Sequence, residues 1–248
     1  MKLTNVLKKQ SNSVRVIAPE VSLDSYKKIN LSDEKLKIES IDYNSSKKLS
    51  AYINDYLNID NKKVAYGGYL EKRSIYKRSS NFNSLDNKND RNIHLGIDLW
   101  TNAGTPVLAA FDGSIHSFKN NNNLGDYGPT VILEHIVQGI KFYTLYGHLS
   151  LNDLISLRIG DEVLSGSAIA SLGTSEENGD YPPHLHFQII IDLGDFNGDY
   201  PGVCSKNDLK YYRHNCPDPD LVLKLSNFWQ VPILHYLYQE VLAYTLVF

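Results

Sequence analysis

The stretch Pro182-Pro183-His184-Leu185-His186-Phe187-Gln188-Ile189-Ile190-Ile191 predicts a β-strand that emerges from a loop. Aromatic, aliphatic and β-branched residues dominate it from Phe187 onward, and the two prolines cannot donate hydrogen bonds to a sheet. Because side chains alternate between the faces of a strand, His184 and His186 share one face and Leu185 lies on the other. Two imidazoles on one rigid face can build a metal or acid–base site, but two surface histidines would give the same pattern.

Two upstream motifs add candidate ligands. The first, His94-Leu95-Gly96-Ile97-Asp98, places a histidine and an aspartate four residues apart, and Tyr146-Gly147-His148-Leu149 puts another histidine at the end of a predicted strand. Two imidazoles and one carboxylate are a known ligand set for catalytic zinc. On a straight strand His94 and Asp98 would stand roughly 13 Å apart, too far to share one ion. We therefore expect the chain to bend between them, and Gly96 is the residue that could permit the bend.

The order of these motifs resembles that of the lysostaphin-type zinc metallopeptidases of family M23. The resemblance covers residues 67–193 and includes turn motifs that match the framework of that family: Gly104-Thr105-Pro106-Val107, Asp112-Gly113, Gly160-Asp161-Glu162-Val163 and Gly166-Ser167-Ala168-Ile169-Ala170. It implies that His94, Asp98 and His186 bind a Zn²⁺ ion. It also implies that His148 and His184 are catalytic histidines that do not bind the metal.

The fold class that we expect is mainly β, with short helices. The resemblance implies an antiparallel β-sheet core of the lysostaphin type, which is a duplicated hybrid motif. The turns at Asp112-Gly113 and at Val137-Gln138-Gly139 each separate two strand-like segments, so we expect two β-hairpins. His135 is expected to be structural. The polar loops at residues 119–128 and 174–183 are expected to form the walls of a cleft.

The chain divides into three segments. Residues 1–65 form an N-terminal appendage with a short helix, in which Leu49, Ile53 and Leu57 share one face, and we favour a packing role for it over that of a plug. Residues 66–193 would be the metallopeptidase domain, and residues 194–248 a C-terminal extension. That extension and the stretch from Gly67 to Tyr76 resemble a peptidase-like domain that some bacterial proteins carry fused to class III aminotransferases.

Composition and charge limit the classes of partner that we expect for this chain. The chain has 248 residues and a formal charge of -3, which gives no reason to expect nucleic acid or an anionic membrane. Short basic groups such as Glu71-Lys72-Arg73 are predicted to be solvated faces. No stretch approaches the length of a transmembrane helix. Residues 1–19 show no secretory signal, which by itself indicates the cytoplasm, but the family is usually exported, so both locations stay open. Cys204 and Cys216 are expected to be thiols, and the apolar residues 228–248 could join two chains in a homo-oligomer.

The resemblance implies a zinc-dependent endopeptidase that hydrolyses peptide bonds, with peptidoglycan peptides as its substrate. No His-Glu-x-x-His motif is present, so histidine would have to carry the proton transfer. Two alternatives stay open. One is a cytosolic metal-dependent hydrolase of small amides or peptides in amino-compound metabolism, which the missing signal and the C-terminal extension favour. The other is a catalytically idle partner-binding module.

Overall fold

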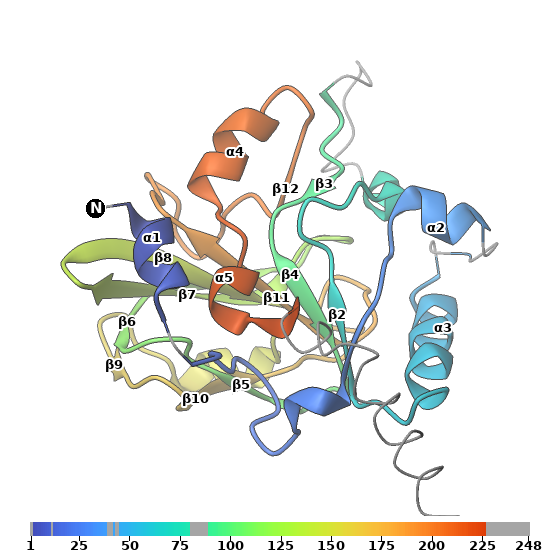
Figure 1. Ribbon diagram of the computed structural model, residues 1–248, viewed down its shortest axis with the longest axis horizontal. Helices are drawn as coiled ribbons and strands as arrows, with labels where there is room; N and C mark the ends of the chain where they lie inside the picture. Colours follow the sequence, from blue (N-terminus) through green and yellow to red (C-terminus); the bar gives the residue numbers. More distant parts are fainter. Residues whose placement is uncertain (1, 11, 39–41, 43–44, 80–88, 227–248) are drawn as a thin grey trace, which may run out of the picture.

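The central element is an eight-stranded sheet, seen in the computed structural model, which describes residues 2–10, 12–38, 42, 45–79 and 89–226 (Figure 1). Its strands follow the order β1-β2-β4-β11-β8-β7-β6-β9. Neighbouring strands are antiparallel except for the parallel pair β1 and β2. The strands are β1 (Tyr26–Lys28), β2 (Val64–Gly67), β4 (Ile97–Trp100), β6 (Gly113–Asn121), β7 (Gly128–Val137), β8 (Ile140–Gly147), β9 (Glu162–Val163) and β11 (His184–Ile190).

Smaller elements surround this sheet. Two short antiparallel pairs join β5 (Pro106–Leu108) to β10 (Ala168–Ser171) and β3 (Ile93–His94) to β12 (Val203–Cys204). The helices are α1 (Leu3–Lys8), α2 (Asp33–Ile38), α3 (Ser46–Asn58), α4 (Leu209–Asn215) and α5 (Asp220–Leu223), and 3₁₀ turns lie at Leu23–Ser25, Ser74–Arg78 and Leu151–Ser156. The expectation of a mainly β fold with an antiparallel core and short helices is thus confirmed.

Strand β11 lies between β4 and β8 and separates the main core from the candidate site. Its residues Leu185, Phe187 and Ile189 are fully buried in the largest hydrophobic cluster. Because side chains alternate along a strand, His184 and His186 face the other way, and both line a cavity. The predicted alternation along this strand is confirmed.

Only one of the two predicted hairpins forms. Strands β7 and β8 pair directly, and Gln138 and Gly139 between them have φ angles of 51° and 75°, the left-handed conformation that tight hairpin turns require. The hairpin expected at Asp112-Gly113 is wrong, because β5 pairs with β10 while β6 pairs with β7 and β9. Gly113 is there for close approach, since a Cβ on it would lie 2.2 Å from the carbonyl oxygen of Glu134.

The predicted N-terminal helix is confirmed as α3. The Ser45 side chain caps it by accepting a hydrogen bond from the Lys48 backbone N–H at 3.3 Å. Leu49, Ile53 and Leu57 are buried along one face, as the spacing indicates. They pack into a second hydrophobic cluster that also contains Leu31, Ile75, Tyr76 and Trp100. The N-terminal segment therefore packs against the strands that carry the candidate site.

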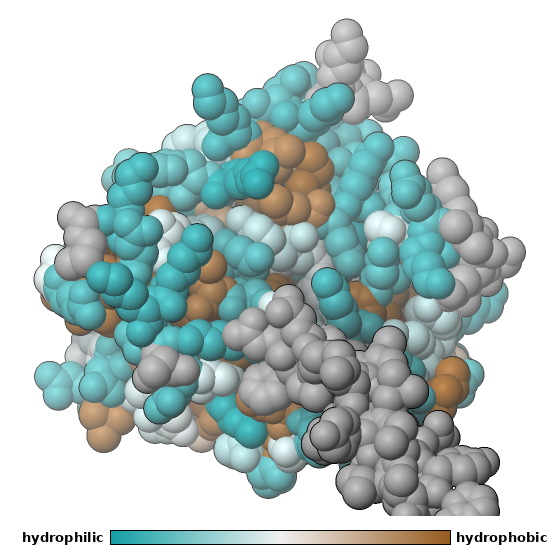
Figure 2. Space-filling model, viewed as in Figure 1, coloured by the Kyte–Doolittle hydropathy of each residue, from teal (hydrophilic) through white to brown (hydrophobic). Residues whose placement is uncertain are grey.

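One face of the protein is mostly polar (Figure 2), and both thiols of the chain are buried. The face in Figure 2 is mainly hydrophilic, with separate hydrophobic patches. The part of the chain that the structure describes has no helix with the length and apolar character needed to cross a membrane. Cys204 and Cys216 are both buried and free. The expected homo-oligomer contact at residues 228–248 lies outside the described residues.

Candidate metal centre

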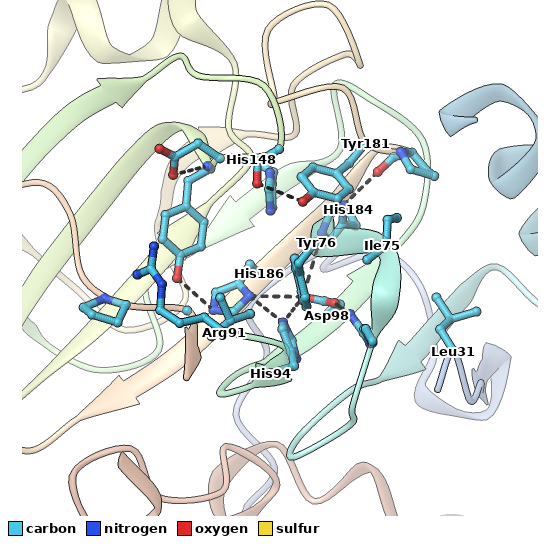
Figure 3. Close-up of a pocket in the computed structure, with 18 of the residues that line it drawn as sticks. Leu31, Ile75, Tyr76, Arg91, His94, Asp98, His148, Tyr181, His184 and His186 are labelled. Atoms are coloured by element: carbon cyan, nitrogen blue, oxygen red, sulfur yellow. Dashed lines mark hydrogen bonds and ion pairs between the residues drawn. The ribbon is translucent and has the colours of Figure 1, made fainter. Parts of the chain in front are cut away.

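Three donor atoms meet on the face of the sheet opposite the main core. His94 ends β3, Asp98 lies in β4, and His186 in β11 stands directly opposite Asp98 in the strand register. His94 Nε2 lies 2.8 Å from His186 Nδ1 and 3.1 Å from Asp98 Oδ1, and the third side, from His186 Nδ1 to Asp98 Oδ1, is 3.2 Å (Figure 3). A tetrahedral zinc site with bonds of about 2.0–2.1 Å separates its donors by about 3.3 Å. The donor triangle therefore has the size and chemistry that zinc needs.

The chain bends between His94 and Asp98, as expected. Strand β3 ends at His94, the backbone bends at Gly96, and β4 begins at Ile97. The glycine is required by its neighbours, since a Cβ on Gly96 would lie 2.7 Å from the His186 ring and 2.7 Å from the Phe187 carbonyl oxygen. Gly96 thus lets two strands bring their ligands together without a side chain between them.

Hydrogen bonds fix the tautomer of both histidines in this triangle. His94 Nδ1 lies 3.0 Å from the Gly68 carbonyl oxygen, which only accepts, so that nitrogen carries the proton and Nε2 keeps its lone pair. His186 Nε2 donates to Gln188 Oε1 at 2.9 Å, because Gln188 Nε2 is turned to the Pro201 carbonyl oxygen at 3.1 Å. His186 Nδ1 is therefore free to bind. Such outer partners orient the ligands of metal sites.

Arg73 pairs with only one of the two carboxylate oxygens of Asp98. Its Nη1 donates to Asp98 Oδ2 at 2.5 Å, which leaves Oδ1 facing the two histidines. Glu71 holds the same guanidinium through Oε2, 2.9 Å from Nη2. Arg73 is only 5% exposed, so the expectation that Glu71-Lys72-Arg73 is a solvated face is wrong for this arginine. An unpaired carboxylate at Asp98 would be costly to bury, and Arg73 provides the opposite charge.

The two remaining histidines stand beside the triangle with their rings 4.2 Å apart. His184 Nδ1 donates to the Pro182 carbonyl oxygen at 2.7 Å and His148 Nδ1 to that of Asn178 at 2.8 Å. Both Nε2 atoms are therefore unprotonated, and His184 Nε2 lies 3.8 Å from Asp98 Oδ1. His148 has a φ angle of 64°, a left-handed conformation that is uncommon outside glycine and often marks functional positions.

Burial decides the charge state of the cluster. All five side chains are buried, none of the residues being more than 5% exposed. Burial lowers the pKa of His94 and that of His184 to about 4, and burial with the neighbouring His184 lowers the pKa of His148 well below its usual value. Burial works to raise the pKa of Asp98, but the electrostatic interactions with His94 and with the Arg73 guanidinium hold it well below its ordinary range. The imidazoles of His94, His148 and His184 are thus neutral near pH 7, and the carboxylate of Asp98 is ionised.

The cluster opens into a cavity of about 180 Å³. The loops expected as cleft walls do contribute, through Tyr127 and Tyr181. Leu31, Leu49 and Ile75 also line it, although no sequence signal connected them with the site. Figure 3 shows Leu31 and Ile75 on one side of Asp98 and Arg91 on the other.

Sequence reasoning missed Arg73 and Gln188, which hold the ligands. Gln188 lies two residues after His186, so strand alternation alone could have placed it on the same face. Arg73 gave no comparable signal, because it lies just before the 3₁₀ turn Ser74–Arg78 and only the fold brings it to Asp98 in β4. His135, by contrast, is structural as expected, with Nε2 2.7 Å from Thr144 Oγ1 and Nδ1 3.0 Å from the Asp112 carbonyl oxygen.

Residues 92–198 match the model of Peptidase family M23. The chain is 35% identical over 99 residues to an uncharacterized metalloprotease of Haemophilus influenzae. The matching region covers 40% of this chain and 18% of that relative. It is also 33% identical over 99 residues to a protein of Vibrio cholerae named Peptidoglycan DD-endopeptidase ShyA. That match covers 40% of this chain and 20% of the relative. The chain thus spans about a fifth of the length of these relatives.

Among solved structures, the catalytic domain of lysostaphin from Staphylococcus simulans is similar to this chain. The two are 22% identical, and the match covers 62% of this chain and 95% of that domain, with a TM-score of 0.35.

Proposed function

We propose that this chain belongs to peptidase family M23 and is a zinc-dependent endopeptidase of the lysostaphin type. The observation that carries the proposal is the donor triangle, whose three atoms lie within 3.2 Å of one another. Each of its histidine tautomers leaves a lone pair facing the centre. The match of residues 92–198 to the family model supports the same function.

His94, Asp98 and His186 are the proposed zinc ligands. A zinc ion bound there would supply Lewis acidity, which lowers the pKa of a water and polarises the carbonyl of the scissile bond. The chain provides the orientation: Gly68 and Gln188 hold the two imidazoles, and Arg73 holds the carboxylate. We place the peptidase domain at residues 66–193, with residues 1–65 and 194–248 as additions to it.

His148 and His184 are the proposed acid–base residues. Their Nδ1 protons are held by backbone carbonyl groups, so Nε2 of either ring can accept the proton of the attacking water. The proton would then pass from that imidazolium to the leaving amine, so that no net proton is gained by the protein. Because burial keeps both rings neutral near pH 7, they would act as bases without first losing a proton.

The substrate proposed is a peptide, with peptidoglycan peptides as the first candidate, because one relative is named as a peptidoglycan endopeptidase. A hydrolase of small amides or peptides is the second candidate, and the limited volume of the cavity favours it. The idle binding module is disfavoured by the complete donor set, because a module without catalysis has no need of it.

The test is a hydrolysis panel with the zinc-loaded full chain. Purified peptidoglycan, glycine-rich peptides and small amides would be incubated in parallel, and newly released amino groups would be counted. We expect release from at least one peptide class, and a loss of release in the His186→Ala variant. If the zinc-loaded protein releases no amino groups from any class, the endopeptidase proposal is wrong.

A further inference from the structure

The cavity beside the donor triangle has an apolar end. Leu31, Leu49 and Ile75 line it, and they are 4%, 3% and 7% exposed. Tyr76 and Trp100 extend this lining toward the histidines, with the Trp100 ring stacked on that of His184 at 5.7 Å. The other lining residues include charged Arg91, Asp126 and Asp199. The cavity is therefore polar at one part of its wall and apolar at another.

This apolar wall comes from outside the stretch that matches the family model. Leu31 follows β1, Leu49 lies in α3, and Ile75 lies in the 3₁₀ turn Ser74–Arg78, whereas the match begins at residue 92. The three residues belong to the second hydrophobic cluster and not to the main core. The N-terminal part of this chain thus adds a wall that the matched stretch does not contain.

Two sets of polar contacts hold this wall against the site. The Leu31 backbone N–H donates to Glu71 Oε2 at 3.4 Å, and Glu71 pairs with Arg73, which pairs with Asp98. At the start of α3, Ser46 Oγ donates to Asp180 Oδ1 at 2.7 Å. Since Asp180 precedes Tyr181 of the cavity wall, both Leu31 and Leu49 have fixed positions relative to the donor triangle.

We propose that this apolar end is a specificity subsite for an apolar side chain next to the scissile bond of the substrate. The inference rests on the proposed peptidase function and deepens it. Water at this end finds few polar partners, so a leucine or aromatic side chain that displaces it gains free energy. Glycine would leave the subsite unfilled. The preferred substrates are therefore peptides with a bulky apolar residue at the cleaved bond, and glycine-rich peptides are poorer ones.

The experiment compares blocked pentapeptides that differ only in the central residue, which is Gly, Leu or Phe in a glycine background. Release of amino groups by the zinc-loaded full chain gives kcat/KM for each. We expect the leucine peptide to exceed the glycine peptide by at least about tenfold, the lower end of what one methylene in a hydrophobic pocket provides. Equal values, or a preference for glycine, would overturn the proposal.

Substitutions in the wall of the cavity test which residues produce the preference for apolar side chains. Leu49→Ala enlarges the apolar end, so the ratio of kcat/KM for the phenylalanine peptide over the leucine peptide should rise by about tenfold or more, and Leu31→Ala should act in the same direction. Leu57→Ala is the matched control, because Leu57 is buried on the same face of α3 and in the same cluster but does not line this cavity. An equal change in the control, or none in Leu49→Ala, would contradict the subsite.

Binding to the zinc-free chain separates this proposal from the proposed function. N-acetyl-leucine amide should shift the NMR signals of residues at the cavity and bind at least about tenfold more tightly than N-acetyl-glycine amide. Binding of this kind without hydrolysis would refute the peptidase proposal and support the apolar subsite. Hydrolysis without any difference in binding between the two amides would support the peptidase proposal and refute the apolar subsite.

Discussion

Replacing Gln188 with leucine should weaken zinc binding without touching a ligand. Gln188 Oε1 accepts the proton of His186 Nε2 at 2.9 Å, which keeps Nδ1 free for the metal. In Gln188→Leu the nearest other partner of that N–H is the Tyr127 hydroxyl at 3.4 Å. The ring can then take the other tautomer and donate from Nδ1 to Asp98 Oδ1, 3.2 Å away. That hydrogen bond would occupy two of the three donor atoms at once.

The size of the effect follows from this competition. Losing the hydrogen-bond partner of a metal-binding histidine weakens metal binding by about 10–100-fold, which corresponds to about 1.4–2.7 kcal/mol. The variant also leaves the Pro201 carbonyl oxygen without its donor at 3.1 Å, so the metal-free protein should lose about 1–3 kcal/mol of stability. The two losses are separable because the first is seen only when zinc is present.

The assay is a competition titration against a chromophoric zinc chelator at neutral pH, with urea unfolding of the zinc-free protein alongside. Gln188→Glu is the matched variant, since its carboxylate still accepts from His186 Nε2 and should retain zinc binding close to that of the wild type. If Gln188→Leu binds zinc as tightly as the wild type, Gln188 does not set the tautomer and the reasoning is refuted.

Three further outcomes are expected. His148→Gln and His184→Gln should retain one zinc per chain while their hydrolysis rates fall by about 100-fold or more; a loss of zinc in either would make that residue a ligand. Arg73→Met should lose about 3–5 kcal/mol in urea unfolding of the zinc-free chain because the buried Asp98 carboxylate loses its cation, and Arg73→Lys should lose less; equal losses would contradict the charge argument. Burial lowers the pKa of His135, so below about pH 6.5 the unfolded chain binds a proton that the folded protein does not bind until a lower pH. The free energy of unfolding should therefore fall through this residue by about 1.4 kcal/mol for each pH unit, and urea titrations of His135→Gln should show a correspondingly weaker acid dependence, whereas an unchanged slope would exclude this contribution.

Local patterns predicted the parts of the fold that local physics determines. The alternation along β11 placed His184 and His186 on one face, and the spacing of Leu49, Ile53 and Leu57 gave the buried face of α3. Gly139 correctly marked the turn between β7 and β8, because its backbone is left-handed. The close grouping of His94, Asp98 and His186 also agrees with the set that the resemblance implied.

Long-range contacts account for what the sequence did not reveal. The pair Asp112-Gly113 has the sequence of a tight turn, but Gly113 instead allows β6 to approach β7 closely. The sequence alone indicates a surface position for Arg73, and only the fold brings Asp98 of β4 into contact with it. Leu31 and Leu49 are ordinary apolar residues along the chain, and only the packing of the N-terminal segment on the sheet brings them to the cavity. Each case depends on which segments become neighbours in the fold, and local periodicity carries no such information.

The most direct test of the account is anomalous diffraction at the zinc absorption edge from crystals of the zinc-loaded full chain. We expect one strong anomalous peak in the described part of the chain, bonded to His94 Nε2, Asp98 Oδ1 and His186 Nδ1 at about 2.0–2.2 Å. His148 and His184 should remain outside the bonding distance. A peak bonded to either of those two histidines, or no peak between the three donor atoms at full zinc loading, would contradict the proposed metal centre.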